Sequence, residues 1–201
     1  RVMVTPPNRA GKVHPALLLA ARSIGINEVY KLGSAWAVAA LAFGTESIAP
    51  VEVIAGPGNQ YVNIAKRLLF GQVGIDSFAG PSEVLIVADD SVPAEWIAAD
   101  LIAQAEHAGD SKAILVALSR KVAEAVNSVV EKRVRAEPRR ELIEQSLSGG
   151  GVIIVAENTE AALELVNTCA PEHLQLLVRD PQEWISGVRN AGAIFAGPYT
   201  P

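Results

Sequence analysis

The apolar stretch Val84-Leu85-Ile86-Val87-Ala88 indicates the fold class, because five consecutive residues pass without a polar side chain. A strand with apolar residues on both faces is typical of the middle of a parallel sheet, where helices cover both sides. Similar apolar runs recur at residues 113–118 and 152–155. These stretches predict an α/β fold built around a parallel sheet.

Strands and helices are expected to alternate on both sides of this stretch, which is the order of repeated βα units. We predict two Rossmann-like βα units, residues 1–78 and 79–201, with parallel sheets flanked by helices, both incomplete. The predicted strands are residues 2–4, 28–31, 51–55, 84–88, 113–118, 152–155, 174–178 and 193–195. The predicted helices are residues 15–23, 35–43, 60–70, 93–107, 121–132, 138–149, 159–167 and 182–190.

The composition excludes some partners and allows a large core. Half of the 201 residues are hydrophobic, and 17 basic residues stand against 22 acidic ones, which gives a net charge of -5. The two short basic segments, residues 131–135 and 138–140, are predicted to be solvated helix faces. No long basic run is present, so we expect no nucleic-acid partner.

The single cysteine, Cys169, excludes an internal disulfide and favours a reducing compartment. We expect it to be a small buried apolar residue, with a catalytic thiol as the alternative. No secretory leader or membrane-length apolar run is evident, which predicts a cytoplasmic protein without a membrane partner. The chain starts at Arg1 inside a strand-like run and stops at Pro201 in a loop, so we expect both ends to be cut.

Two of the three histidines stand in polar groupings that suggest chemistry. Gln104 and His107 are three residues apart, which on a helix places an amide oxygen and an imidazole nitrogen on one face, half of a zinc site. The alternative is a pair of ordinary polar residues at a helix end. Glu172 and His173 follow a proline between a helix and a strand and can move protons near neutral pH. The third histidine, His14, is predicted to cap a helix.

Two turns offer further polar groups. Gly56-Pro57-Gly58-Asn59 follows a strand and opens a helix, where free N–H groups suit an anionic or polar ligand. An ordinary βα turn is the alternative, and three spaced glycines of a dinucleotide fingerprint are missing from it. Gly80-Pro81-Ser82-Glu83 precedes the central strand, and Ser82 is predicted to contact substrate or shape the turn. No nucleophile elbow surrounds Ser82.

Four runs, taken in order, resemble histidinol dehydrogenase over essentially the whole chain. They are Gly56-Pro57-Gly58-Asn59-x-Tyr61-Val62-x-x-Ala65-Lys66-Arg67, Ile75-Asp76-x-x-Ala79-Gly80-Pro81-Ser82-Glu83, Ala99-Asp100-Leu101-x-x-Gln104-Ala105-Glu106-His107 and Ala170-Pro171-Glu172-His173-Leu174. The chain is similar to the central part of such an enzyme, without either end of the family chain.

The resemblance implies a zinc-dependent homodimeric oxidoreductase that converts L-histidinol through L-histidinaldehyde to L-histidine with two NAD. By motif it makes Gln104 and His107 zinc ligands that also contact the substrate. It makes Glu172 and His173 the acid–base pair, with Glu172 also contacting the substrate. Ser82 would contact the substrate as well, and Asn59 the cofactor.

The sequence departs from the family pattern in two places. The run Gly33-Ser34-Ala35-Trp36 stands where the family usually has Gly-Gly-Ala-Gln. Trp36 cannot replace an amide as donor and acceptor, but it can stack on a cofactor ring or block the site. The remaining zinc ligands, an Asp and a His, are expected beyond Pro201, so the isolated chain is expected to be inactive.

Two other readings remain open from the sequence. One is a paralogue that oxidises another small polar alcohol, which the Trp36 departure favours. The other is an inactive α/β fragment of such an enzyme, which the end of the chain at Pro201 favours.

At the start of the helix predicted at residues 35–43, Ser34 is expected to be the N-cap.

Overall fold

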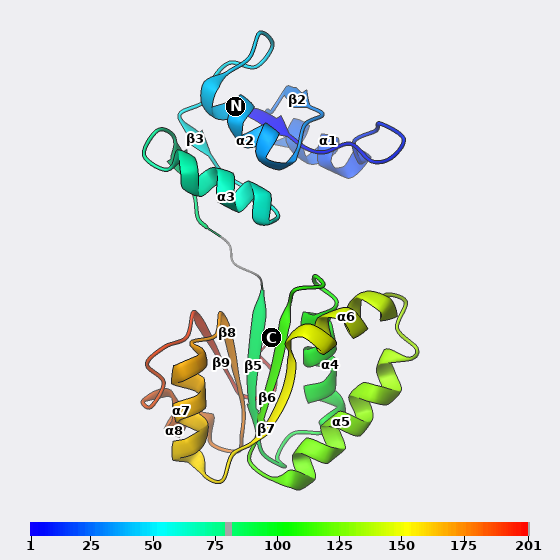
Figure 1. The fold of residues 1–201 in the computed structure, drawn as a ribbon, viewed down its shortest axis with the longest axis vertical. Helices are drawn as coiled ribbons and strands as arrows, with labels where there is room; N and C mark the ends of the chain where they lie inside the picture. Colours follow the sequence, from blue (N-terminus) through cyan, green and yellow to red (C-terminus); the bar gives the residue numbers. More distant parts are fainter. Residues whose placement is uncertain (79–81, 201) are drawn as a thin grey trace. The chain divides into compact units, whose positions relative to one another are not determined.

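A computed structural model describes residues 1–78 and 82–200, and it divides the chain into two compact units, Arg1–Gly80 and Pro81–Pro201 (Figure 1). The division expected from the sequence falls after residue 78. All strand pairs among the described residues are parallel, and helices flank them, which confirms the α/β fold. Gly80 and Pro81 of the Gly80–Glu83 turn lie outside the described residues.

The first unit contains two short parallel pairs. β1 (Val2–Val4) pairs with β2 (Glu28–Tyr30), and β3 (Val53–Ile54) pairs with β4 (Gly74–Ile75). The sequence predicted β1, β2 and β3 in this unit but not β4, which is only two residues long. The helices of the first unit are α1 (Pro15–Ser23), α2 (Ser34–Phe43) and α3 (Gln60–Leu69).

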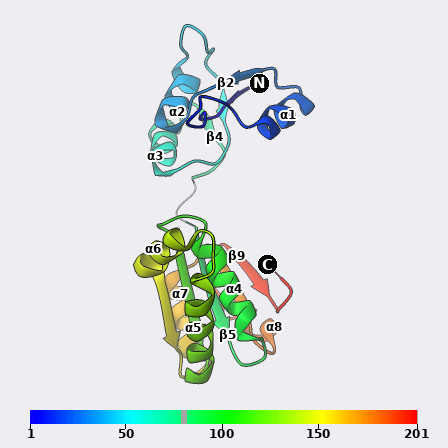
Figure 2. The same cartoon turned by 90° about the vertical axis from the view of Figure 1, so that its right-hand side faces the viewer.

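The second unit contains one five-stranded sheet in the order β7-β6-β5-β8-β9. Its strands are β5 (Glu83–Ala88), β6 (Lys112–Ala117), β7 (Gly151–Val155), β8 (His173–Leu177) and β9 (Ala193–Ala196). Its helices are α4 (Ala94–Ala105), α5 (Arg120–Val134), α6 (Arg140–Gly150), α7 (Thr159–Cys169) and α8 (Pro181–Ile185). Figures 1 and 2 show α4, α5 and α6 on one side of the sheet and α7 and α8 on the other.

The central strand β5 is buried on both faces, as its apolar sequence predicted. Ile86 packs into a cluster with residues of α4 and α5, whereas Leu85 and Val87 pack into a second cluster with residues of α7 and Trp184. All three β5 side chains are 0% exposed. The strand therefore joins the two halves of the core of this unit.

Leu85→Ala is expected to destabilise the second unit by about 2–5 kcal/mol, because it opens a cavity in a layer without solvent access. Native-state hydrogen exchange of the β5 and β6 amides would measure the loss in free energy of opening. Val155→Ala, at an exposed strand end, is the control and should change it by less than about 0.5 kcal/mol. An equal effect of the two substitutions would contradict the assignment of Leu85 to the core.

Two helix boundaries differ from expectation for local reasons. α4 ends at Ala105, so His107 lies in the turn after the helix, where its N–H donates to the Gln104 carbonyl. α8 ends at Ile185, because the side chain of Asn167 holds the following backbone through its bonds to Gly187 O and Arg189 N. These two helices were therefore predicted too long at their C-terminal ends.

Three predictions for single residues were also tested. His14 caps α1 as predicted, with Nδ1 accepting from the Ala16 N–H at 3.2 Å. Ser34 is not a cap: Gly33 holds that position, and Ser34 is the first helical residue with a φ of 60°. Cys169 is exposed rather than buried, because it ends α7 on the outer side of the unit. No helix of the described residues is long and apolar enough to span a bilayer.

Candidate functional site

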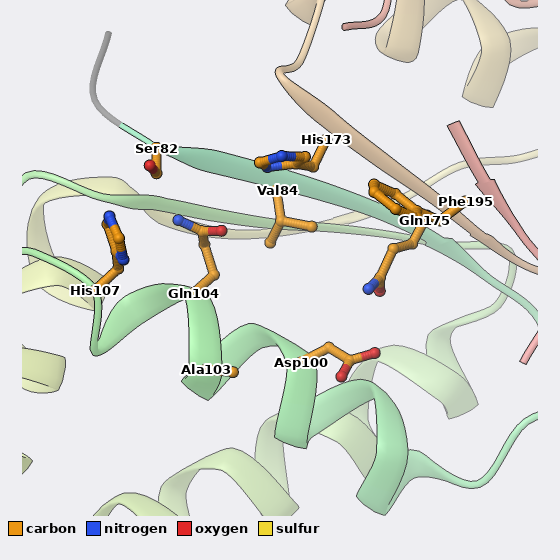
Figure 3. A pocket seen from close by; sticks show the side chains of 9 residues that line it. All are labelled: Ser82, Val84, Asp100, Ala103, Gln104, His107, His173, Gln175 and Phe195. Atoms are coloured by element: carbon orange, nitrogen blue, oxygen red, sulfur yellow. The ribbon is translucent and has the colours of Figure 1, made fainter. Parts of the chain in front are cut away.

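A pocket of about 370 Å³ in the second unit brings together four of the residues singled out in the sequence. Figure 3 shows Gln104 next to His107 at the end of α4, with Ser82, just before β5, and His173, at the start of β8, across from them. The pocket is lined by Ser82, Val84, Asp100, Ala103, Gln104, His107, His173, Gln175 and Phe195. Most of these residues come from α4, β5, β8 and β9, whereas Ser82 precedes β5 and His107 follows α4.

The pocket lies at the amino-terminal edge of the sheet. Ser82 directly precedes β5, and His173 is the first residue of β8. α4 starts at the opposite edge and runs back, so its last turn returns to the start of β5. Open α/β sheets more often bind ligands at the carboxyl ends of their strands. In this unit the site forms at the amino-terminal edge instead, because the last turn of α4 lies there.

The parallel register places the strand residues of the pocket on one face. Val84 pairs with His173, and Gln175 pairs with Phe195. Alternate residues of a strand point to the same face, so His173 and Gln175 both face α4. The rings of His173 and Phe195 lie 5.8 Å apart between centroids. Phe195 thereby packs against one side of the imidazole.

Glu172 lies beside the pocket without lining it. Its Oε2 accepts a hydrogen bond from the Glu83 N–H at 3.3 Å and lies 3.8 Å from His173 Nδ1. Half of the Glu172 side chain is exposed. The carboxylate therefore ties the starts of β5 and β8 together and is close enough to influence the orientation of His173.

The pocket residues Asp100, Gln175 and Phe195 were not assigned a role from the sequence. Asp100 precedes Gln104 by one helical turn, and Gln175 is the one polar residue in the apolar run of β8. Burial raises the pKa of the Asp100 carboxyl, while the neighbouring Gln175 amide opposes the shift. A polar residue inside an otherwise apolar strand was the signal available for Gln175.

Asp100→Asn is expected to stabilise the second unit at neutral pH by up to about 1 kcal/mol, since the partial exposure of Asp100 weakens the effect of burial. A raised folded-state pKa means that folding disfavours the carboxylate, so the destabilisation is present above the ordinary pKa of 3.8 and disappears below it. Thermal unfolding at pH 7 and pH 3 would measure this. Asp110→Asn, at an exposed position, is the matched control and should show no such pH-dependent gain.

The donor atoms in the pocket suit one side of a metal site. Gln104 Nε2 is buried and has no hydrogen-bond partner among the described residues. Rotating the amide by half a turn puts Oε1 in the same place, next to the imidazole of His107. An amide oxygen and an imidazole nitrogen are both zinc ligands. Within residues 1–78 and 82–200 no group of three His, Cys, Asp or Glu residues is placed to hold a metal. Gln104 and His107 together offer two donor atoms that a metal could use.

The expected cofactor residues Asn59 and Trp36 belong to the first unit. Asn59 caps α3, its Oδ1 accepting from the N–H groups of Tyr61 and Val62, so Nδ2 is the end of the amide left to meet a ligand. The α-carbon of Gly56 faces open space, which allows close approach to the turn. Trp36 on α2 is 76% exposed and can stack on a flat ring. These features fit a cofactor with an aromatic ring and polar groups.

Gly58 allows the turn to pack closely on its own helix. A β-carbon on Gly58 would clash with the side chain of Val62. Gly56 has a φ of 139°, which side-chain-bearing residues rarely adopt. Both glycines therefore fix the shape of the Gly56–Asn59 turn.

The fold and the pocket define an α/β protein whose site combines an amide–imidazole pair with a second imidazole and a hydroxyl. The family model described as histidinol dehydrogenase matches residues 1–201. The chain is 49% identical over 198 residues to histidinol dehydrogenase of Moorella thermoacetica, covering 98% of this chain and 47% of the relative. It is 52% identical to the enzyme of Desulfotalea psychrophila, over 100% of this chain and 46% of the relative.

Two solved structures are similar to the chain. Histidinol dehydrogenase from Elizabethkingia anophelis matches with a TM-score of 0.90 and 38% identity, over 98% of this chain and 46% of that one. A gamma-glutamyl phosphate reductase from Thermotoga maritima matches with a TM-score of 0.53 at 14% identity, which shows a similar fold alone. The chain belongs to the histidinol dehydrogenase family, and it spans about half the length of the relatives it matches.

Proposed function

We propose that the complete protein is a zinc-dependent histidinol dehydrogenase that oxidises L-histidinol through L-histidinaldehyde to L-histidine with two NAD. The observation that carries the proposal is the convergence of Ser82, Gln104, His107 and His173 in one pocket. Membership of the family over all 201 residues supports the same substrate. We further propose a cytoplasmic homodimer, on the resemblance to the family and the single cysteine.

Gln104 and His107 would hold the zinc ion with ligands from elsewhere in the complete protein. When bound, zinc would orient the substrate and NAD would accept the hydride. Ser82 lies across the pocket from these two residues and can hydrogen-bond a polar group of the substrate. The pocket thus offers separate anchors for the two ends of a small polar alcohol.

His173 is the proposed proton acceptor of the first oxidation. Its imidazole lines the pocket and is packed against Phe195 on one side, so it can take the alcohol proton as the hydride leaves the carbon. Glu172 is proposed to activate water in the second oxidation, as its carboxylate stands next to His173 at the rim. Keeping the aldehyde in the pocket between the steps protects a reactive intermediate.

The test is NADH formation from L-histidinol by the complete protein, with zinc and after its removal by a chelator. We expect zinc-dependent formation of two NADH for each histidinol consumed. One NADH per histidinol would refute the two-step reaction, and full turnover in the metal-free protein would refute the role of zinc.

A paralogue that oxidises another small polar alcohol is the second candidate, and exposed Trp36 is the observation that favours it. An indole in place of an amide changes what the cofactor region can bind. A panel of amino alcohols assayed with the wild type and Trp36→Gln separates the two candidates. Turnover of another alcohol at a higher kcat/KM than L-histidinol would favour the paralogue.

A further inference from the structure

Lys66 is a charged residue in a place where an apolar one would pack. It is 2% exposed, on the face of α3 that also carries Val62, Ala65 and Leu69 toward the core of the first unit. Burying an ammonium group costs several kcal/mol unless strong partners surround it. The contacts of the Lys66 ammonium group should therefore explain how its burial is stabilised.

The partners of Lys66 are Asp76 and Gly56. Lys66 Nζ lies 2.7 Å from Asp76 Oδ1 and donates to the Gly56 carbonyl oxygen at 2.5 Å. The other carboxylate oxygen, Asp76 Oδ2, accepts from the Gly56 N–H at 2.8 Å. The two ends of one ion pair thus hold both the N–H and the C=O of Gly56.

The bonds to Lys66 and Gly56 lower the pKa of the Asp76 carboxyl to about 2, so it stays ionised at neutral pH. Gly56 has the unusual φ of 139°, and it begins the turn that ends three residues later at the cap of α3. The ion pair therefore constrains the backbone at Gly56, because glycine has more conformational freedom than any other residue type.

We propose that Lys66 and Asp76 are positioning residues for cofactor binding, which hold the Gly56–Asn59 turn so that Asn59 faces the cofactor. The Oδ1 atom of Asn59 is fixed by Tyr61 and Val62, and so the direction of Nδ2 depends on where the turn meets the helix. A shift at Gly56 moves that meeting point. The inference rests on the proposed function, since it needs a protein that binds NAD.

The test compares Lys66→Met with Arg67→Met in the complete protein. Arg67 is the next residue on α3 and is exposed, so its replacement removes the same charge without touching the turn. Calorimetry would give the Kd for NAD, and steady-state kinetics would give KM for NAD and for L-histidinol. Lys66→Met is expected to raise the Kd and KM for NAD about 10- to 100-fold and to change KM for L-histidinol less than about threefold.

Asp76→Asn is the second variant, in case Lys66→Met does not fold, with Glu52→Gln at an exposed position of the same unit as its control. If Lys66 and Asp76 act as one unit, the effects of their substitutions on NAD affinity are non-additive. The double variant Lys66→Met/Asp76→Asn should therefore bind NAD no more weakly than Lys66→Met alone. A folded Lys66→Met or Asp76→Asn protein with lower thermal stability but unchanged affinity for NAD would overturn the inference. A wild-type protein that does not bind NAD would overturn the proposed function, and the inference with it.

Discussion

In the complete protein, His173→Asn is expected to lower kcat by about 10²- to 10⁴-fold, the usual contribution of a positioned acid–base group. His173 lines the pocket opposite Gln104 and His107, with one side packed against Phe195. An asparagine side chain retains a polar group at this position but cannot take up the alcohol proton. Zinc content should stay unchanged, because His173 is not one of the proposed ligands. The measurements are single-turnover NADH formation and metal analysis.

His14→Asn is the matched control, since it removes another imidazole while an asparagine can still cap α1. It should leave kcat and zinc content at wild-type values. If His173→Asn retained more than about a tenth of wild-type kcat, the proton-acceptor role would be excluded. A loss of zinc together with activity would instead make His173 a ligand.

His107→Ala should reduce the zinc affinity of the complete protein by more than about 100-fold, because outer partners of metal ligands alone contribute 10- to 100-fold. Turnover should fall with the bound metal. His107 is exposed and lies in the turn after α4, so its removal leaves the core unchanged. Metal analysis after dialysis and a competition titration with a chromogenic chelator would measure the effect.

Gln104 allows a sharper control for the same half-site. Gln104→Glu keeps an oxygen donor at the buried amide position and should retain zinc, whereas Gln104→Leu removes the donor and should lose it. Unchanged zinc affinity in both His107→Ala and Gln104→Leu would show that the metal is held elsewhere. The half-site assignment would then be wrong.

The apolar sequence of β5 was sufficient to predict the parallel sheet, because burial on both faces leaves a continuous signal along the strand. The pairing of β3 with β4 carried no such signal: Gly74 and Ile75 form a strand too short for any period. The shorter α8 was equally hidden, since the side chain that holds its C-terminal backbone belongs to Asn167 on α7.

The sequence predicted several residues of the candidate site, but not the complete set that lines the pocket. His107 and His173 stood out because the chain has only three histidines, and Gln104 stood out because it lies three residues before His107. Asp100 and Gln175 did not, since a polar residue inside a helix or strand has meaning only when the facing element is known. The packing of α4 against the start of the sheet supplied that information.

The register that pairs Val84 with His173 joins residues 89 positions apart in the chain, and so does the hydrogen bond from the Glu83 N–H to Glu172. Contacts of such long sequence separation form slowly, because the loop-closure entropy must be overcome before any pairing compensates for it. Ser82 and His173 therefore meet only when β8 docks beside β5, after the local helices have formed. Assembly of the pocket should accordingly be a late event in the folding of this unit, and it should follow the slowest phase of refolding.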